Sequence, residues 1–274
     1  MAATTWRDQL RGRRWLWLAG GALLLLALLL TLWRTVGQPR DRIWERMEET
    51  GVWRVAMDPS FPPFETLDAA GRPVGFDVDL ARAMAARWGV EAGIESVGFD
   101  SLVDAVWASR VDTALSALPY QPQFSQDVAF SQPYFEAGLM LVAASGRDDL
   151  NTLEDLAGQR IAVEWGSEGD LQARALRRQS PETVILPLET AQDALQAVVD
   201  GDADAALVDR VSALQFPSIA QLRIAPEPVV SDPYVVVMPR KASILQQRVD
   251  ETLRALKEDG TLAELEARWF GEQP

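Results

Sequence analysis

Residues 53–65 read WRVAMDPSFPPFE, and this stretch decides the fold. Trp53 to Met57 is short and apolar-rich, which is typical of a buried strand, and prolines that follow it can neither donate to a β-ladder nor lie inside a helix. The chain must therefore leave the sheet at Asp58. Ligands of α/β sheets bind where strands end, so this loop, with its carboxylate and the rings of Phe61 and Phe64, predicts one wall of a ligand pocket.

The segments that follow alternate between strand and helix patterns. Apolar residues from Val78 to Trp88 keep a helical spacing that ends at Gly89, and residues 90–97 read as the next strand. A turn-rich boundary at residues 145–149 precedes a second set of elements in the same order. The sequence therefore predicts an α/β fold with two lobes. We expect lobe 1 at residues 51–143 with 232–274, lobe 2 at 144–231, and a linker at 35–50.

Composition narrows the possible functions. The chain has 274 residues and a formal charge of −14, and it contains no cysteine and no histidine. Disulfides, thiolate nucleophiles, Cys/His zinc sites and an imidazole general base are therefore excluded, and no cofactor or metal is expected. The acidic side chains lie mostly beyond residue 50, so nucleic acid is not expected as a partner. A monomer is expected.

An uncharged, leucine-rich run lies near the amino terminus, from Trp15 to Trp33. As a helix it would span about 28 Å, close to the apolar thickness of a bilayer. Positively charged residues before the run outnumber the acidic ones, whereas those after it are balanced by acidic residues. This difference favours an amino terminus on the inside of the membrane. We expect residues 1–34 to be a cytoplasmic stub and one transmembrane helix, with the globular part extracytoplasmic. A cleaved signal peptide is the alternative.

Six motifs, in order, resemble those of one family. They are Asp58-x-x-Phe61-x-Pro63-Phe64-Glu65, Gly75-Phe76-Asp77-Val78-Asp79-Leu80, Phe130-Ser131-x-Pro133-Tyr134, Asp155-Leu156-x-Gly158, Ala203-Asp204-Ala205 with Asp209, and Gly260-Thr261-x-x-x-Leu265-x-x-x-Trp269-Phe270-Gly271. Together they look like the polar-amino-acid class of solute-binding proteins, from about residue 43 to the carboxyl terminus. The resemblance implies a periplasmic-binding-protein type 2 fold, with a ligand cleft between two lobes joined by two crossing strands. Such proteins deliver ligand to an ABC transporter permease.

The family's ligand-binding positions can be matched to this sequence. The resemblance implies that Asp58 and Asp209 hold an α-ammonium group, that Phe61 packs on the ligand side chain, and that Ser167 lies near its carboxylate. The full set of predicted ligand-binding residues is Asp58, Phe61, Phe64, Ala117, Phe124, Glu164, Ser167, Glu168 and Asp209. No catalytic residue is expected.

One family feature is missing. The arginine that clamps the ligand carboxylate should fall near position 124, where this chain has Phe124, while Glu164 and Glu168 add acidic groups. Closing a cleft over unpaired carboxylates costs several kcal/mol for each, and a cationic ligand would offset this cost. We therefore expect a cationic amine or amino-acid-like ligand, with free carboxylate recognition lost. Arg210 is the alternative carboxylate partner.

The sequence also allows other interpretations. Asp58 could only cap a turn, Asp209 could only cap a helix, Phe61 and Phe64 could be core rings, and Glu164 and Glu168 could face solvent. In function, the alternatives to a binding protein are an enzyme of the cyclohexadienyl-dehydratase type on the same fold, with Glu164 or Glu168 as acid or base, and a tethered sensor with a degenerate pocket.

Overall fold

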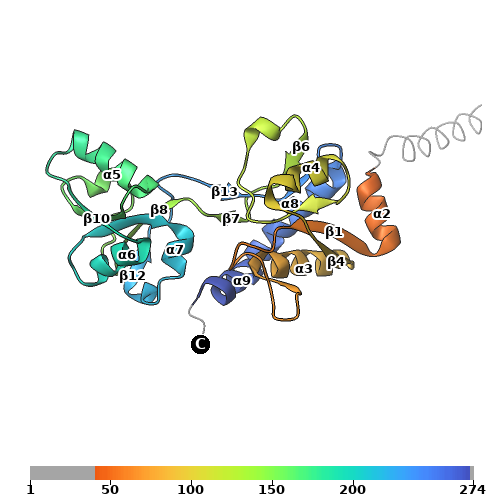
Figure 1. The fold of residues 1–274 in the computed structure, drawn as a ribbon, viewed down its shortest axis with the longest axis horizontal. Helices are drawn as coiled ribbons and strands as arrows, with labels where there is room; N and C mark the ends of the chain where they lie inside the picture. Colours follow the sequence, from red (N-terminus) through yellow and green to blue (C-terminus); the bar gives the residue numbers. More distant parts are fainter. Residues whose placement is uncertain (1–40, 272–274) are drawn as a thin grey trace, which may run out of the picture. The chain divides into compact units, whose positions relative to one another are not determined.

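Two five-stranded mixed sheets organise the part of the chain that the computed structural model describes, residues 41–271 (Figure 1). We call the part built on the sheet with order β4-β1-β5-β14-β6 the first lobe. The part built on the sheet with order β10-β9-β11-β8-β12 is the second lobe. The prediction of an α/β fold with two lobes is confirmed.

The first sheet contains the strand that was predicted at residues 53–57. Strand β1 (Val52–Met57) pairs in parallel with β4 (Glu91–Ser96) and with the short β5 (Thr113–Ala114). Strand β14 (Val237–Pro239) runs antiparallel to both β5 and β6 (Val128–Phe130). The sheet is therefore mixed, because a strand from near the end of the chain enters it in the opposite direction.

The second sheet repeats this order of strands. Strand β9 (Arg160–Glu164) pairs in parallel with β10 (Val184–Leu188) and β11 (Ala205–Asp209). Strand β8 (Leu139–Ala144) lies antiparallel between β11 and β12 (Leu222–Ile224). The repeat that the order of elements predicted is thus a repeat of sheet topology, with the carboxyl ends of β9 and β11 at the same edge.

Helices cover both sheets. Those of the first lobe are α2 (Arg42–Thr50), α3 (Phe76–Trp88), α4 (Leu102–Trp107), α8 (Ser243–Glu258) and α9 (Thr261–Phe270). Those of the second lobe are α5 (Glu168–Gln179), α6 (Ala191–Val199) and α7 (Arg210–Leu214). Short 3-10 turns are η1 (Phe99–Ser101), η2 (Pro122–Phe124), η3 (Glu154–Leu156) and η4 (Ile219–Gln221), and β2 (Thr66–Leu67) pairs with β3 (Pro73–Val74) in a small hairpin.

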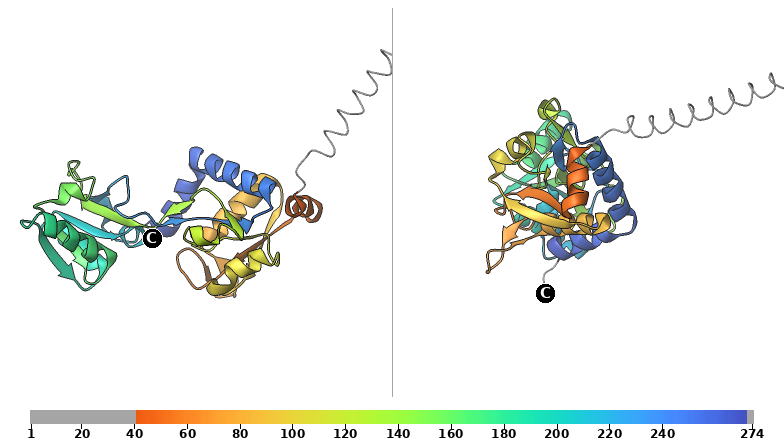
Figure 2. Two further views of the ribbon diagram at one scale, coloured as in Figure 1. Left: turned by 90° about the horizontal axis from the view of Figure 1, so that it is seen from above. Right: turned by 90° about the vertical axis from the view of Figure 1, so that its right-hand side faces the viewer.

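An aromatic cluster ties the carboxyl-terminal helices to the first lobe. The ring of Phe64 is fully buried, and its centroid lies 5.0 Å from that of Phe135 and 5.1 Å from that of Phe270 at the end of α9. Figure 2 shows α8 and α9, in blue, against the elements of the first lobe. Aromatic pairs at this spacing bury a large apolar area. Phe64 is therefore a core residue of this lobe.

Two short strands connect the lobes. Strands β7 (Phe135–Glu136) and β13 (Pro233–Tyr234) pair antiparallel to each other and to no other strand, with Phe135 opposite Tyr234 (Figure 1). The predicted lobe boundary at residue 143 needs correction, because β8 already belongs to the second sheet. The turn at residues 145–149 follows β8 and does not cross between lobes.

The predicted linker at residues 35–50 also needs correction in its second half. Helix α2 packs on the first lobe with Met47 buried. Arg46 of this helix and Arg54 of β1 both pair with Asp112, which is fully buried. Residues 42–50 are therefore part of the folded domain.

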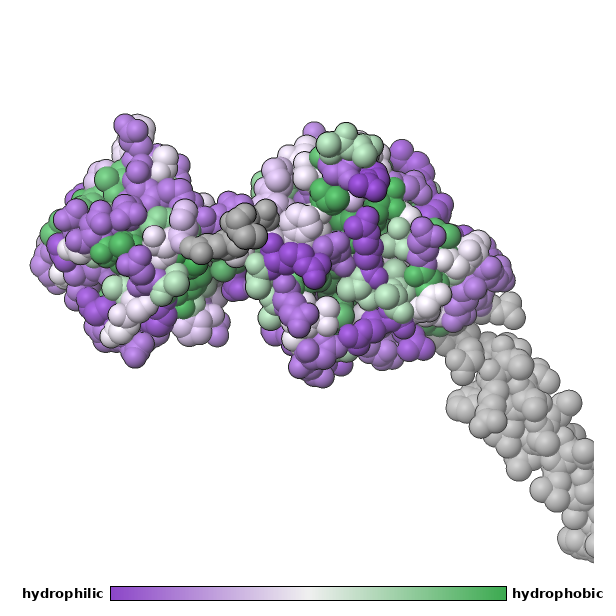
Figure 3. Space-filling model, turned by 90° about the horizontal axis from the view of Figure 1, so that it is seen from below, coloured by the Kyte–Doolittle hydropathy of each residue, from purple (hydrophilic) through white to green (hydrophobic). Residues whose placement is uncertain are grey.

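The expected membrane segment from Trp15 to Trp33 lies outside the described residues. Within residues 41–271, no helix has the length and apolar character needed to cross a bilayer. Polar residues cover most of the face that Figure 3 shows, with apolar residues scattered between them.

Candidate functional site

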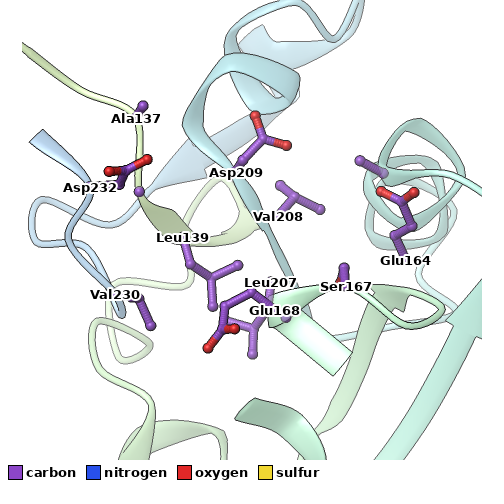
Figure 4. A pocket seen from close by; sticks show the side chains of 13 residues that line it. Ala137, Leu139, Glu164, Ser167, Glu168, Leu207, Val208, Asp209, Val230 and Asp232 are labelled. Atoms are coloured by element: carbon purple, nitrogen blue, oxygen red, sulfur yellow. The ribbon is translucent and has the colours of Figure 1, made fainter. Parts of the chain in front are cut away.

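The candidate site is a pocket at the carboxyl edge of the second sheet, with a volume of about 240 Å³. Its walls come from the ends of β9 and β11, the first residues of α5 and α6, and the chain next to the crossing strands (Figure 4). The lining residues are Ala137, Gly138, Leu139, Glu164, Ser167, Glu168, Gly169, Ala191, Leu207, Val208, Asp209, Val230 and Asp232. Parallel strands place ligand sites at this edge of a sheet.

The first wall is the turn from β9 into α5. Ser167 caps the helix, since its hydroxyl accepts a hydrogen bond from the amide of Asp170 at 3.3 Å. A side chain at Gly169 would place its Cβ 2.3 Å from the carbonyl oxygen of Leu207. Glycine is therefore required here for α5 to approach β11, and this approach places Glu168, the first residue of α5, at the pocket.

Asp209 forms the second wall, where β11 ends and α7 begins. Its carboxylate accepts a hydrogen bond from the amide of Ser212 at 2.8 Å, so it caps the short helix α7. The side chain also lines the pocket. Asp209 therefore combines the two roles, cap and candidate ligand contact, that the sequence allowed.

The third wall belongs to the crossing strands. The Glu136 carboxylate accepts hydrogen bonds from the amides of Gly138 at 3.0 Å and Asp232 at 2.6 Å, and from the hydroxyl of Ser231 at 2.7 Å. The pKa of Asp232 is raised above its ordinary value, mainly by partial burial and to a lesser extent by the negative charge of Glu136. The chain next to the crossing strands thus adds an acidic side chain to the pocket.

The pocket is acidic on several sides. Glu164, Glu168, Asp209 and Asp232 line it, and none of its thirteen lining residues is lysine or arginine (Figure 4). Arg210 does not enter it: its guanidinium pairs with Glu266 at 2.9 Å and lies 5.5 Å from the centroid of the Phe135 ring. The arrangement can bind a cation. The first amides of α5, which have no acceptor within the helix, offer donors to an anionic group.

Four of the nine predicted ligand-binding residues share this pocket, namely Glu164, Ser167, Glu168 and Asp209. The other five lie in the first lobe. Asp58 follows β1 and accepts a hydrogen bond from the amide of Phe99 at 2.8 Å. Phe61 is exposed and stacks on Phe64, with centroids 5.6 Å apart.

Ala117 and Phe124 also lie in the first lobe. Ala117 is buried with a positive φ of 45°, and its amide bonds to Asp77. The ring of Phe124, at the end of η2, is exposed. Phe64 cannot touch a ligand in this structure because its ring is fully buried, as the core-ring interpretation expects.

Sequence reasoning missed two features of the site and one feature of the first lobe. Asp232 precedes a proline in a segment that showed no strand pattern, and Gly169 carried no turn signal that set it apart. Glu65 and Asp77 were part of the quoted motifs, but their complete burial was not foreseen. The available signal was their position, since each acidic residue directly follows a phenylalanine. Among residues 41–271, no group of acidic residues is arranged to hold a metal ion.

Comparison with known proteins gives one family and several relatives. The description "Bacterial extracellular solute-binding proteins, family 3" matches residues 53–272. The chain is 28% identical to "ABC transporter arginine-binding protein 1" of Escherichia coli (strain K12) over 77% of this chain and 87% of that protein. It is 29% identical to the "Lysine/arginine/ornithine-binding periplasmic protein" of the same strain, over 79% and 86% of the two chains.

Similar solved structures include one of an amino-acid solute-binding protein. The structure titled "Ancestral Cationic Amino Acid Solute Binding Protein" is 28% identical, with a TM-score of 0.58, and the match covers 83% of this chain and 99% of that one. The match extends over both lobes.

Proposed function

The chain belongs to the bacterial extracellular solute-binding proteins, family 3, and from this premise we propose that it captures a small cationic ligand of the amino-acid type for an ABC transporter. Capture in such a protein is a two-state equilibrium that ligand shifts by contacting both lobes. The relatives named above bind arginine, lysine or ornithine according to their descriptions.

One observation carries the proposal. The carboxylates of Glu164, Glu168, Asp209 and Asp232 line a single pocket that has no lysine or arginine in its lining. An anionic ligand would add charge of the same sign, and each carboxylate desolvated without a partner costs several kcal/mol. A ligand that carries a positive charge on its side chain, in addition to its α-ammonium group, offsets more of that cost than a neutral amino acid does.

The ligand carboxylate has weaker partners than the ligand cation. No arginine lines the pocket, so the donors available to the ligand carboxylate are the first amides of α5. The interaction of an exposed anion with a helix N-terminus contributes about 0.3–1 kcal/mol. Agmatine, which is arginine without its carboxylate, should therefore bind within about tenfold of arginine. Loss of agmatine binding by a larger factor would show that carboxylate recognition is retained elsewhere.

Isothermal titration of the full chain tests the function. Arginine, lysine, ornithine and agmatine form the cationic set, and glutamine, glutamate and aspartate form the neutral and acidic set. The proposal expects saturable binding within the cationic set and weaker or absent binding of glutamate and aspartate. Tight binding of glutamate with no binding of any cation would overturn it.

A dehydratase on this fold is the alternative to a binding protein. Its substrate prephenate carries two carboxylates, which the acidic pocket would repel, so we expect no turnover of prephenate. Measurable conversion that is lost in Glu164→Gln or Glu168→Gln would favour the enzyme instead. A tethered sensor would bind ligand without a transporter, and reconstitution with a permease encoded next to it would distinguish the two.

We also propose that the run from Trp15 to Trp33 anchors the protein, with residues 41–271 outside the cytoplasm. Support comes from its length and from the positive residues before it. The full chain should stay with the membrane fraction after alkaline carbonate extraction. Recovery in the soluble fraction, with the amino-terminal residues removed, would instead show a cleaved signal peptide.

A further inference from the structure

Two buried acidic residues lie in the first lobe, apart from the pocket. Glu65 ends the proline-rich loop after β1, and Asp77 is the second residue of α3. Both are fully buried, and neither forms an ion pair with any lysine or arginine among the described residues. A buried carboxylate without a cation is costly, so these two groups need another explanation.

The hydrogen bonds of the two groups differ. Asp77 Oδ2 accepts from the amide of Ala117 at 2.6 Å and from the hydroxyl of Tyr134 at 3.0 Å. Glu65 Oε1 accepts only from the hydroxyl of Ser116 at 2.7 Å. Donors stabilise the charged form of a carboxyl group, so the negative charge belongs on Asp77.

The remaining oxygen of each group has no donor. Glu65 Oε2 and Asp77 Oδ1 are buried without a hydrogen-bond partner from any N–H or O–H group of the described chain. The two side chains are nevertheless within hydrogen-bonding reach of each other. Two carboxylates cannot form a hydrogen bond with each other, whereas one proton on Glu65 allows its carboxyl group to donate to that of Asp77.

We propose that Glu65 keeps a proton that it donates to the Asp77 carboxylate, and that this pair positions two candidate ligand contacts of the first lobe, Asp58 and Ala117. The positioning role rests on the proposed function. The amide of Asp58 donates to Ser116 Oγ at 2.9 Å, and Ser116 in turn donates to Glu65. The amide of Ala117, whose φ is 45°, is held by Asp77.

The surroundings agree with this assignment. Burial first, and the Asp77 charge second, raise the pKa of Glu65 far above its ordinary value. Burial also raises the pKa of Asp77, to about 6, but the hydrogen bonds from Glu65, Ala117 and Tyr134 oppose that rise, so Asp77 is the ionised partner at about pH 8. The titratable groups that face the pair are Asp58 and Tyr134, and burial raises the pKa of Tyr134 as well.

Protonation can be measured without any ligand. In the infrared spectrum of the full chain at about pH 8, where ordinary carboxyl groups are ionised, we expect a carboxylic-acid C=O band. The band should vanish in Glu65→Gln and persist in Glu95→Gln, a matched control on the exposed side of β4. Absence of the band from the unaltered protein would overturn the proposal.

Stability gives a second readout. Because only the folded form keeps the proton, the folding equilibrium constant of the unaltered protein should fall tenfold per pH unit relative to Glu65→Gln above about pH 4.3. Glu95→Gln should show no such slope relative to the unaltered protein. A flat ratio for Glu65→Gln would mean that Glu65 releases its proton, contrary to the proposal.

Arginine binding tests the positioning role. Glutamine can donate to Asp77 and accept from Ser116 as protonated glutamate does, so Glu65→Gln should bind arginine within about threefold of the unaltered protein. Glu65→Leu removes both bonds and should weaken binding by at least tenfold; if it does not fold, Ser116→Ala replaces it, since that change breaks the link to Asp58. Unchanged affinity in the folded variant would overturn the positioning role. Failure of the unaltered protein to bind any cation would instead overturn the proposed function, and the infrared result would stand independently.

Discussion

Replacing Asp209 by asparagine separates the ligand contact from the helix cap. The carboxylate lines the pocket and also accepts the hydrogen bond from the Ser212 amide. Asparagine caps helices about as well as aspartate, so Asp209→Asn keeps the cap and removes only the charge. The free energy of unfolding should therefore stay within about 0.5 kcal/mol of that of the unaltered protein.

The effect on ligand binding should be much larger. A hydrogen bond to a charged group contributes about 1.5–3 kcal/mol, and the exposure of Asp209 in this structure favours the lower half of that range. A loss of about 1.5–2 kcal/mol corresponds to an affinity for arginine about 10–30-fold weaker. The change should also reduce the preference for cationic over neutral amino acids.

Calorimetric titration with arginine and thermal unfolding without ligand, on the same preparations, are the assays. Asp200→Asn is a matched control, because Asp200 is an exposed acid at the end of α6 that does not line the pocket. The control should bind arginine like the unaltered protein. Equal affinity in Asp209→Asn and Asp200→Asn would refute the assignment of Asp209, as would a loss of affinity explained by unfolding.

Three further predictions concern the walls of the site and the attachment of α2. Gly169→Ala should destabilise the protein by about 1–3 kcal/mol and weaken arginine binding, because the new Cβ meets the Leu207 carbonyl; normal unfolding and binding would contradict the close approach. Because its pKa is raised, Asp232 takes up a proton at a higher pH than an ordinary aspartate does. It then loses its negative charge, so the affinity for arginine should fall as the pH is lowered. Asp232→Asn should lose that part of the pH dependence, and an unchanged profile would contradict it. Asp112→Asn should cost about 2 kcal/mol in unfolding free energy, since Arg46 and Arg54 lose a fully buried partner but are themselves partly exposed; an effect under about 0.5 kcal/mol would show that α2 is held by its apolar contacts.

Local patterns were sufficient for most elements of the fold. Strand β1 and helix α3 follow directly from the pattern of apolar residues. The boundary between lobes did not, because β8 is a continuous apolar run whose partners lie about 65 and 80 residues further along the chain. Pairing over such distances leaves no local signal.

The residues of the site also differ in how far the sequence could predict their roles. Asp209, Glu164 and Ser167 stand at the ends of strands or the start of a helix, which is where an α/β sheet presents functional side chains. Phe64 was ambiguous, since nothing in its local sequence distinguishes a core ring from a pocket ring. The role proposed for Glu65 and Asp77 was unpredictable, because it depends on four segments, at residues 65, 77, 116–117 and 134, that folding brings together.

Titration of the full chain with arginine and citrulline tests the central claim most directly, because the two ligands have nearly the same size and differ in that citrulline carries no charge on its side chain. If the acidic pocket selects a cation, arginine should bind at least tenfold more tightly than citrulline. Equal or tighter binding of citrulline would contradict the account.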